Sequence, residues 1–292
     1  MHGTGGEDGS LQGMMEMLDL PYTSSNVLGS AVGQDKVIMK EILEYEHVPM
    51  VPWFFVYSND ITNTYKDIEA KAEMIGYPLI IKPANLGSSI GIEIVHKKDE
   101  LKSALSECAK YDDKLVIEKM VKQLKEVNIS VMGNSKDAKV SAIEEVMKGD
   151  EFLSFSNKYL GGGKGTNGSK SSKMAPTKGS KGMASASRIV PARLDGNQQK
   201  EIEEYALKSF KALNASGAVR IDFMIDKEDG SVYVNEINSI PGSLAFYLWK
   251  EVGVDFREEC DLLINNALNV YREKKKKVRS FDTNILSNYK EN

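Results

Sequence analysis

Hydrophobic and polar positions along the chain follow two periods, one typical of helices and one typical of strands. Apolar residues recur at helical spacing over 13–20, 33–49, 62–76, 99–110, 198–214 and 253–275, with Pro49 ending the second stretch. Runs rich in β-branched and aromatic residues predict strands over 51–58, 79–83, 92–95, 114–121, 126–134, 139–147, 217–226 and 231–239. Turn residues such as "KEDG" join neighbouring strands into hairpins. The pattern predicts an α+β fold, and no internal repeat is evident.

One segment follows neither period. Tyr159 to Ser187 consists almost entirely of Gly, Ser, Lys, Thr and Ala. Such a composition cannot bury enough apolar surface to pack, so it predicts a long loop. Long loops within compact domains are usually functional lids or inert inserts, and the residues alone leave both alternatives open.

Composition narrows the class of protein. The 292 residues are 41% hydrophobic and 27% charged, which is ordinary for a globular protein. The net charge of −4 does not favour nucleic acid or a membrane as a partner, and no apolar run approaches the roughly 18 residues of a membrane span. Cys108 and Cys260, far apart in sequence, are typical of free thiols in a reducing compartment. A cytoplasmic enzyme fits these observations.

The hairpin "RIDFMIDKEDGSVYVNEIN" carries candidate metal ligands. Glu236 and Asn238 are two residues apart on one strand, so their side chains share a face of the sheet. Asp222 lies on the partner strand, where antiparallel pairing can bring it next to Glu236. Two carboxylates and an amide oxygen suit Mg²⁺ shared with nucleotide phosphates. An exposed strand face with unrelated acidic residues is the alternative.

Two further stretches suggest nucleotide contacts. Lys82 precedes the loop "ANLGSSIG", and a Gly/Ser loop with a nearby lysine can hold phosphate oxygens. The Walker A spacing is absent, and an ordinary hairpin is the alternative. Glu118 and Lys119 end an apolar strand and precede Glu126, so they could contact an adenine edge and ribose hydroxyls, although a strand ending at the surface has the same pattern.

Taken in order, the motifs "HGTGGEDGSLQG", "KPANLGSSIG", "IEK", "NKY", "RIDF" and "NEINSIPG" resemble those of ATP-grasp D-alanine–D-alanine ligases over nearly the whole chain. The resemblance implies an ATP-grasp fold, in which two α+β subdomains grip ATP, with a truncated Rossmann-like N-terminal domain. We therefore expect a remnant of that domain over 1–26, a central subdomain over 27–118 and a C-terminal subdomain over 119–292. The low-complexity segment, within 159–190, takes the place of the family's active-site lid.

The resemblance also implies roles for particular residues. The expected ATP-binding residues are Lys36, Lys82, Ser88, Ser89, Ile90, Glu118, Lys119, Val121, Glu126 and Lys158. Asp222, Glu236 and Asn238 match the ligands of two Mg²⁺ or Mn²⁺ ions. Between the "IEK" motif and Glu126 this sequence has one residue more than the family usually has, so the match of Glu126 is displaced by one position.

The catalytic residues implied are Arg220, Ser88, Tyr159, Lys158 and Gly242. Arg220 would stabilise the transferring phosphoryl group, and Gly242 would donate its backbone N–H to an oxyanion. The substrate contacts implied are His2, Gly3, Glu7, Ser243 and Tyr247. Tyr247 stands where the family usually has a serine that binds the carboxylate of the second D-alanine, so the Ser243 or Tyr247 hydroxyl would replace it.

The function implied is ATP-dependent ligation of two D-alanines through an acyl phosphate, for peptidoglycan precursor synthesis. Tyr159 favours an amino acid, and not D-lactate, as second substrate. A ligase for D-serine or another small amino acid, and a truncated ATP-binding remnant without activity, are the alternatives. The partners expected are D-alanine and ATP, without nucleic acid or membrane, and a homodimer stays open.

Overall fold

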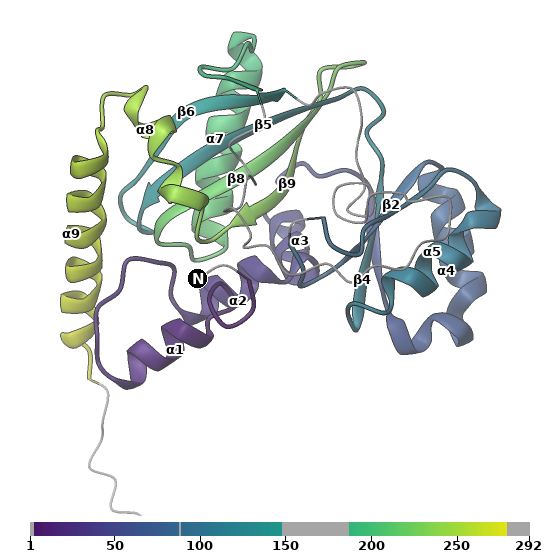
Figure 1. Cartoon of the computed structure of the whole chain (residues 1–292), viewed down its shortest axis with the longest axis horizontal. Helices are drawn as coiled ribbons and strands as arrows, with labels where there is room; N and C mark the ends of the chain where they lie inside the picture. The colour runs from purple at the N-terminus through teal and green to yellow at the C-terminus, as the bar shows by residue number, and fades with distance from the viewer. Residues whose placement is uncertain (1–2, 88, 148–186, 279–292) are drawn as a thin grey trace, which may run out of the picture.

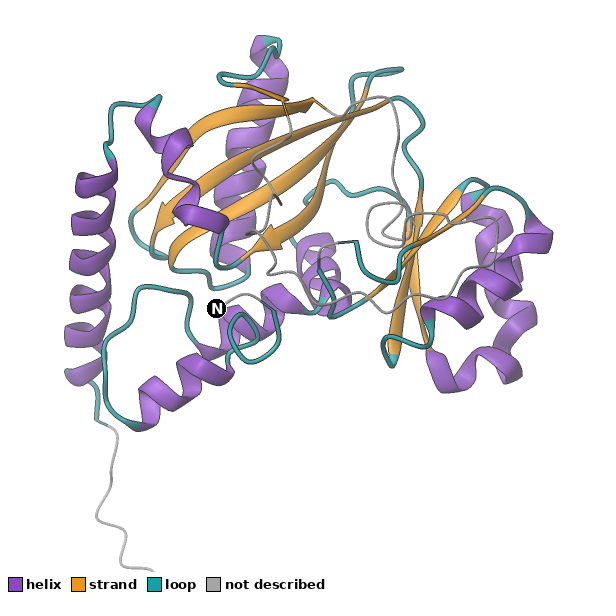
Figure 2. Cartoon of the chain, viewed as in Figure 1, coloured by secondary structure: helices purple, strands orange, loops and turns teal. Residues whose placement is uncertain are grey.

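Two antiparallel sheets, each backed by helices, make up the described part of the chain (Figures 1 and 2). The structure, a computed structural model, describes residues 3–87, 89–147 and 187–278. The smaller sheet has the strand order β1-β4-β2-β3, and the larger has the order β7-β6-β5-β8-β9. The predicted α+β class is therefore confirmed. No helix within these ranges is long and apolar enough to cross a membrane.

The smaller sheet is covered on one face by two amphipathic helices. Its strands are β1 (Trp53–Tyr57), β2 (Leu79–Pro83), β3 (Glu93–Val95) and β4 (Lys114–Lys119), and the helices are α4 (Ile61–Ile75) and α5 (Leu101–Cys108). Ile68, Leu79 and Leu105 are among the fully buried side chains between sheet and helices. β2 pairs with both β3 and β4, so Lys82 stands on an inner strand beside the Gly/Ser loop.

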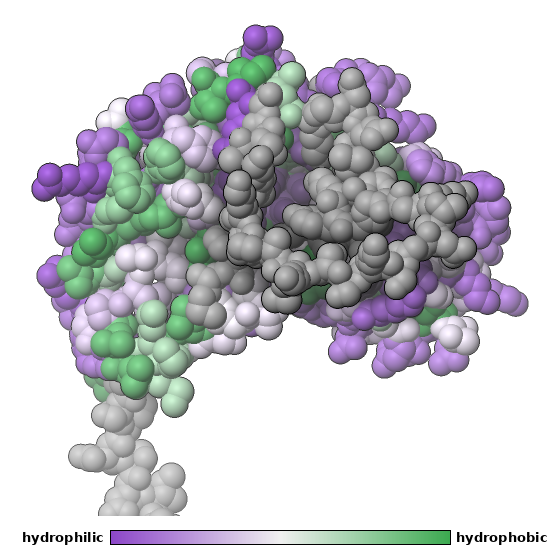
Figure 3. All heavy atoms as spheres, in the orientation of Figure 1, coloured by the Kyte–Doolittle hydropathy of each residue, from purple (hydrophilic) through white to green (hydrophobic). Residues whose placement is uncertain are grey.

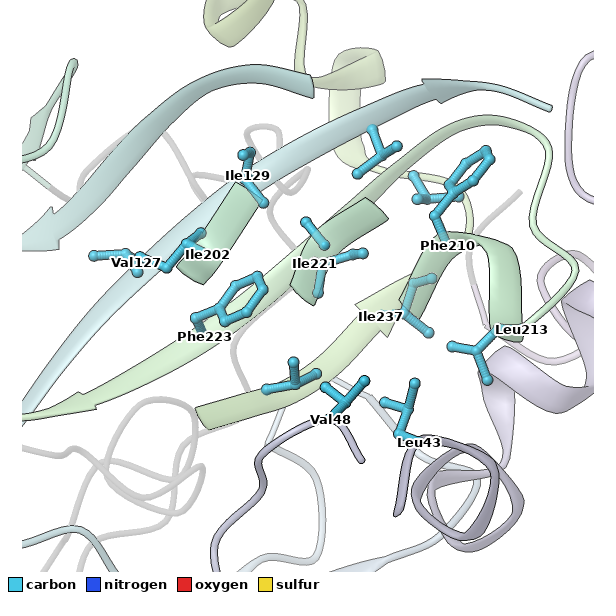
Figure 4. Close-up of a cluster of buried hydrophobic side chains, with 14 of the residues drawn as sticks. Leu43, Val48, Val127, Ile129, Ile202, Phe210, Leu213, Ile221, Phe223 and Ile237 are labelled. Carbon is cyan, nitrogen blue, oxygen red and sulfur yellow. The ribbon is translucent and has the colours of Figure 1, made fainter. Parts of the chain in front are cut away.

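The larger sheet contains the main hydrophobic core. Its strands are β5 (Leu124–Gly133), β6 (Ala138–Met147), β7 (Ser187–Ile189), β8 (Gly217–Asp226) and β9 (Val232–Asn238). Helices α7 (Gly196–Ala212) and α3 (Lys36–Tyr45) pack against one face of it. Figure 4 shows Leu43 beside the same cluster as Phe210, Ile221 and Ile237. Burial of each such side chain stabilises the fold by about 1.5–3 kcal/mol. The apolar face of the larger sheet is therefore held in the core, and its opposite face is left to carry the polar residues.

The N-terminal segment packs onto the end of the larger sheet. It contains α1 (Ser10–Met17) and α2 (Val27–Gln34). Gly217 has a φ of +77°, and a Cβ there would lie 1.9 Å from the carbonyl oxygen of Thr23, so the backbones touch at this point. Met14, Met17 and Leu18 of the α1 region are exposed. Figure 3 shows apolar surface at the lower left, over this part of the molecule.

The element boundaries differ from the expected ones at several places. The helix predicted over 33–49 is interrupted at Asp35, whose carboxylate accepts hydrogen bonds from Val37 and Ile38 and so caps α3. Helix α2 was not predicted as a separate element, because its last two residues were included in the helix predicted over 33–49. The helix predicted over 13–20 begins three residues earlier, at Ser10. The loop predicted over 159–190 is wrong at its end, because 187–189 pair with β6 as strand β7.

Two helices complete the chain, and the second contains a buried acid. α8 (Phe246–Lys250) and α9 (Phe256–Lys275) contact strands of the larger sheet. Trp249 packs beneath α9 and donates a 3.0 Å hydrogen bond to Ser130. Glu259 on α9 is 0% exposed, and neither carboxylate oxygen has a hydrogen-bond partner among the residues that the structure describes. An uncharged carboxyl group tolerates such a site better than a carboxylate does.

This burial predicts a pH-dependent stability. Burial raises the pKa of Glu259 from 4.5 to about 7, so the folded protein holds a proton that the unfolded chain releases. The free energy of unfolding should therefore fall by roughly 2 kcal/mol as pH rises from 5 to 8. Glu259→Gln should remove this dependence and stabilise the protein at pH 8, as measured by urea unfolding at several pH values. The exposed neighbour supplies the control Glu258→Gln, and an unchanged slope in Glu259→Gln would contradict the assignment.

Candidate active site

A cleft between the two sheets is lined by seven of the candidate site residues. Its volume is about 320 Å³. The smaller sheet and its Gly/Ser loop contribute Lys82 and Ser89, and the larger sheet contributes Glu126, Arg220, Asp222 and Glu236. Charged groups from both sheets therefore face the same space, although Lys82 and Glu236, for example, lie 154 residues apart in sequence.

The β8–β9 hairpin brings the predicted acids together. Asp222 pairs directly with Glu236, as predicted, and Arg220 pairs with Asn238. Arg220 binds Asp222 through two hydrogen bonds of 2.7 and 2.8 Å, and Asn238 donates a third of 3.2 Å. Burial raises the pKa of Asp222 to about 6 even though Arg220 opposes this, and Glu236 adds to the rise. The hairpin thus gathers negative charge that a bound cation would neutralise.

These ligands fit a metal that is shared with a substrate. Within the described ranges, no group of three or more His, Cys, Asp or Glu residues gathers closely enough to hold an ion. Asp222, Glu236 and Asn238 supply only two carboxylates and one amide oxygen. Mg²⁺ characteristically binds one or two carboxylates and completes its octahedral shell with phosphate oxygens and water. The donor set is therefore appropriate for a cation that arrives with a nucleotide.

A buried charge network lies behind the cleft. The Glu118 carboxylate contacts the Nζ atoms of Lys40 at 3.1 Å and Lys82 at 2.7 Å, and all three side chains are nearly or fully buried. Burial alone would raise the pKa of Glu118, but the two ammonium groups lower it to about 2. Burial lowers the pKa of Lys40, whereas at Lys82 the Glu118 carboxylate outweighs burial and raises the pKa. The network holds the Lys82 ammonium at the cleft wall in its charged form.

Lys36 connects α3 to the Gly/Ser loop. Its Nζ donates to the carbonyl of Leu86 at 2.6 Å, and its backbone N–H donates to Ala84 at 3.0 Å. Burial lowers the pKa of its ammonium group, and the nearby Glu236 opposes this. Ser89, three residues after Leu86 in the same loop, has a φ of +60° and lines the same cleft. The cation and the loop thus meet at one end of the cleft, as expected for phosphate-binding groups.

The residues expected around adenosine do not all face the cleft. Glu126 lines it from β5. Lys119 directs its ammonium group to the carbonyls of Gly76 and Tyr77. Val121 is buried against Val51 and is not among the residues that line the described cleft. Any contact of these two residues with a nucleotide would therefore come from the backbone.

The expected substrate residues come from both ends of the chain. The loop after Gly3 is closed by Glu7, whose carboxylate accepts a hydrogen bond from the Gly3 N–H. The Glu7 carbonyl accepts a 3.5 Å hydrogen bond from Ser239, so this loop reaches the turn that follows β9. Gly242 begins the turn before α8, and Ser243 is exposed with a φ of +52°.

Four of the expected site residues lie outside the described residues, namely His2, Ser88, Lys158 and Tyr159, as does 159–186 of the expected lid. Ile90 lies in the described part of the loop, where its N–H donates to Gly87.

Three charged residues at or behind the cleft were missed from the sequence. Lys40 lies on the buried face of α3 between Val37 and Leu43, and a lysine inside an apolar stripe is a readable signal of a buried ion pair. Glu144 on β6 and Arg188 on β7 line the far end of the cleft. Arg188 sat within a segment that appeared to be loop, so no pattern indicated its orientation.

Comparison with known proteins connects this geometry to a family. Residues 42–265 match the family model described as D-ala D-ala ligase C-terminus. A D-alanine–D-alanine ligase of Thermosipho africanus is 39% identical over 289 residues, which cover 98% of this chain and 71% of the relative.

Solved structures agree with this result. The structure of a D-alanine–D-alanine ligase from Coxiella burnetii has a TM-score of 0.73 at 29% identity, covering 94% of this chain and 68% of that one. A D-alanine–D-alanine ligase from Bacillus anthracis, complexed with ATP, has a TM-score of 0.71 at 28% identity, covering 94% of this chain and 79% of that one.

Proposed function

The chain belongs to the D-alanine–D-alanine ligase family, and from this premise we propose that it joins two D-alanines into D-alanyl-D-alanine with cleavage of ATP to ADP and phosphate. It is a ligase with the ATP-grasp fold, and its product serves peptidoglycan precursor synthesis and hence the cell wall. The observation that carries the assignment is the cleft in which Lys36 and Lys82 face Asp222 and Glu236. Cations for phosphate and ligands for a divalent ion converge there.

ATP occupies this cleft in the proposal. Its phosphates contact Lys36, Lys82 and the loop over 88–90, with Lys158 as a further contact. Glu126 takes the ribose, and the strand end from Glu118 to Val121 takes the adenine. The buried network around Glu118 supports this placement, because it keeps Lys82 charged without exposing it to water. The division into subdomains over 27–118 and 119–292 stays a prediction.

Asp222, Glu236 and Asn238 hold Mg²⁺ or Mn²⁺, two ions in all, in the proposal. The accumulation of negative charge at Asp222 and Glu236 supports it. Bound there, the ions neutralise charge on the transferring phosphoryl group. Arg220, whose pKa Asp222 raises despite burial, stays cationic beside them and stabilises the same group.

The reaction proceeds in two steps. The carboxylate of the first D-alanine attacks the γ-phosphorus and forms an acyl phosphate, with ADP leaving. The amine of the second D-alanine attacks the acyl carbon, a proton is lost, and phosphate leaves. His2, Gly3 and Glu7 would surround the first D-alanine, and the Gly242 N–H would bind the oxyanion. Ser88, Tyr159 and Lys158 complete the proposed machinery. The acyl phosphate hydrolyses in water, so the site must exclude solvent, which is the proposed purpose of the segment over 159–186.

The proposal includes a cytoplasmic location, where ATP and D-alanine are both available. A homodimer also stays a proposal, supported only by the habit of the family.

The test is product formation by the purified full chain. With ATP, Mg²⁺ and D-alanine, we expect ADP release that depends on D-alanine, together with D-alanyl-D-alanine detected by mass spectrometry. L-alanine is the matched control and should support neither. ADP release without dipeptide would contradict the proposal, and a mixed dipeptide formed preferentially with D-serine would favour the alternative ligase.

A further inference from the structure

Arg188, Tyr247 and Glu144 form a cluster at the β7 end of the cleft. The Tyr247 hydroxyl donates a 2.8 Å hydrogen bond to Glu144, and the Asn128 amide donates another of 3.0 Å. The Arg188 guanidinium lies over the Tyr247 ring, 4.8 Å from its centre, and one nitrogen is 3.7 Å from Glu144. Glu144 is 1% exposed, so a buried carboxylate anchors the tyrosine, and the tyrosine supports the arginine.

The cluster lies in line with the proposed reaction centre. Asn128 pairs with Glu144 on one side and with Asp222 on the other, and Asp222 pairs with Glu236. Paired residues point to the same face of a sheet, so these side chains form a row across four strands. Arg188 pairs with Val146, two residues from Glu144, and therefore points to the same face.

The row has the length that a small substrate requires. Neighbouring strands are about 4.8 Å apart, so β7 lies roughly 14 Å from β8. Arg188 and Asp222 line the same cleft. A small amino acid bound between them would turn its amine toward Asp222 and its carboxylate toward Arg188.

Tyr247 itself is poorly placed to bind that carboxylate. Burial and the neighbouring Glu144 raise the pKa of its hydroxyl, which stays protonated and donates to Glu144. Arg188, in contrast, lines the described cleft with its guanidinium over the Tyr247 ring. A guanidinium stacked on an aromatic ring presents its N–H groups at the edge, where a carboxylate can accept two of them.

We propose that Arg188 binds the carboxylate of the second D-alanine, and that Tyr247 and Glu144 are positioning residues that orient its guanidinium. This inference rests on the proposed function. It assigns to a cation from β7 the task that the family usually gives to a serine at the position of Tyr247.

The test is Arg188→Met in the full chain. A charge-assisted hydrogen-bonded pair contributes about 1.5–3 kcal/mol, which corresponds to roughly a 10- to 100-fold rise in KM for the second D-alanine. The KM values for ATP and for the first D-alanine should change little. Arg188→Lys should recover part of the loss. Arg193→Met, an exposed arginine five residues away, is the matched control and should behave as wild type.

D-alaninamide, an amine donor without a carboxylate, separates loss of carboxylate binding from a general structural defect. A structural defect would lower activity with both donors equally. The wild type should prefer D-alanine to D-alaninamide as amine donor, and Arg188→Met should lose this preference. An unchanged KM, or a retained preference, would overturn the assignment of Arg188 alone. If the wild type forms no dipeptide from D-alanine, the proposed function fails, and the assignment fails with it.

Discussion

Replacement of Glu236 by Gln is expected to lower the rate of dipeptide formation by about 10³-fold while the protein remains folded. Glu236 is half-buried on β9 and pairs with Asp222, so an amide removes one of two carboxylates from the proposed metal site. A catalytic divalent ion contributes several kcal/mol of charge stabilisation, and each 1.36 kcal/mol is tenfold in rate. ADP release and dipeptide, measured at saturating ATP and Mg²⁺, give the ratio.

The same hairpin offers the control. Glu228 lies in the exposed turn between β8 and β9, and Glu228→Gln changes the net charge equally without touching the cleft. Its activity should equal that of wild type, and circular dichroism should show both variants folded. Activity of Glu236→Gln within about threefold of wild type would refute the metal assignment.

Of the substitutions discussed, Glu118→Gln should lower the free energy of unfolding most. The substitution leaves the ammonium groups of Lys40 and Lys82 facing a neutral amide in a site where Glu118 is 1% exposed. Breaking a buried ion pair by removing one partner costs about 3–5 kcal/mol, because the other charge remains buried without compensation. Urea unfolding at pH 7 would measure this loss, together with weaker ATP binding as Lys82 loses its partner.

A second substitution separates lost charge balance from lost packing. Lys40→Met combined with Glu118→Gln removes one of the two buried cations, so the double variant should be more stable than the sum of the single variants predicts. If Glu118→Gln alone loses less than about 1 kcal/mol, or if the two changes are additive, the network does not stabilise the fold as proposed.

The hairpin with Asp222 and Glu236 was predictable because two local rules agree there. A short turn fixes the register of its strands, and alternation then fixes which side chains share a face. Most helices and strands followed from their hydrophobic periodicity, although α2 and α8 were missed. The boundary at Asp35 was not predicted, since a capping carboxylate inside a continuous apolar stripe leaves the period unchanged.

Contacts between segments that are distant in sequence could not be predicted from local sequence patterns. Lys40 and Glu118 meet only because α3 packs in the core of the larger sheet while its charged side chains reach the smaller one. The position of Arg188 depends on the pairing of β7 with β6, and three residues are too few for a periodic signal. The partners of Tyr247 likewise come from strands that lie more than 50 residues away in sequence.

The strand order of the larger sheet has a consequence for how such an enzyme can diverge. β7 is one edge strand of the larger sheet, whereas the proposed metal ligands stand on the inner strand β8 and on β9, the edge strand at the opposite side. A change at one edge disturbs a single row of strand pairing, and three strands separate β7 from β9. If Arg188 binds the amine donor as proposed, new preferences for that donor can be selected, or engineered, at β7 while the strands that carry the proposed metal ligands are inherited unchanged.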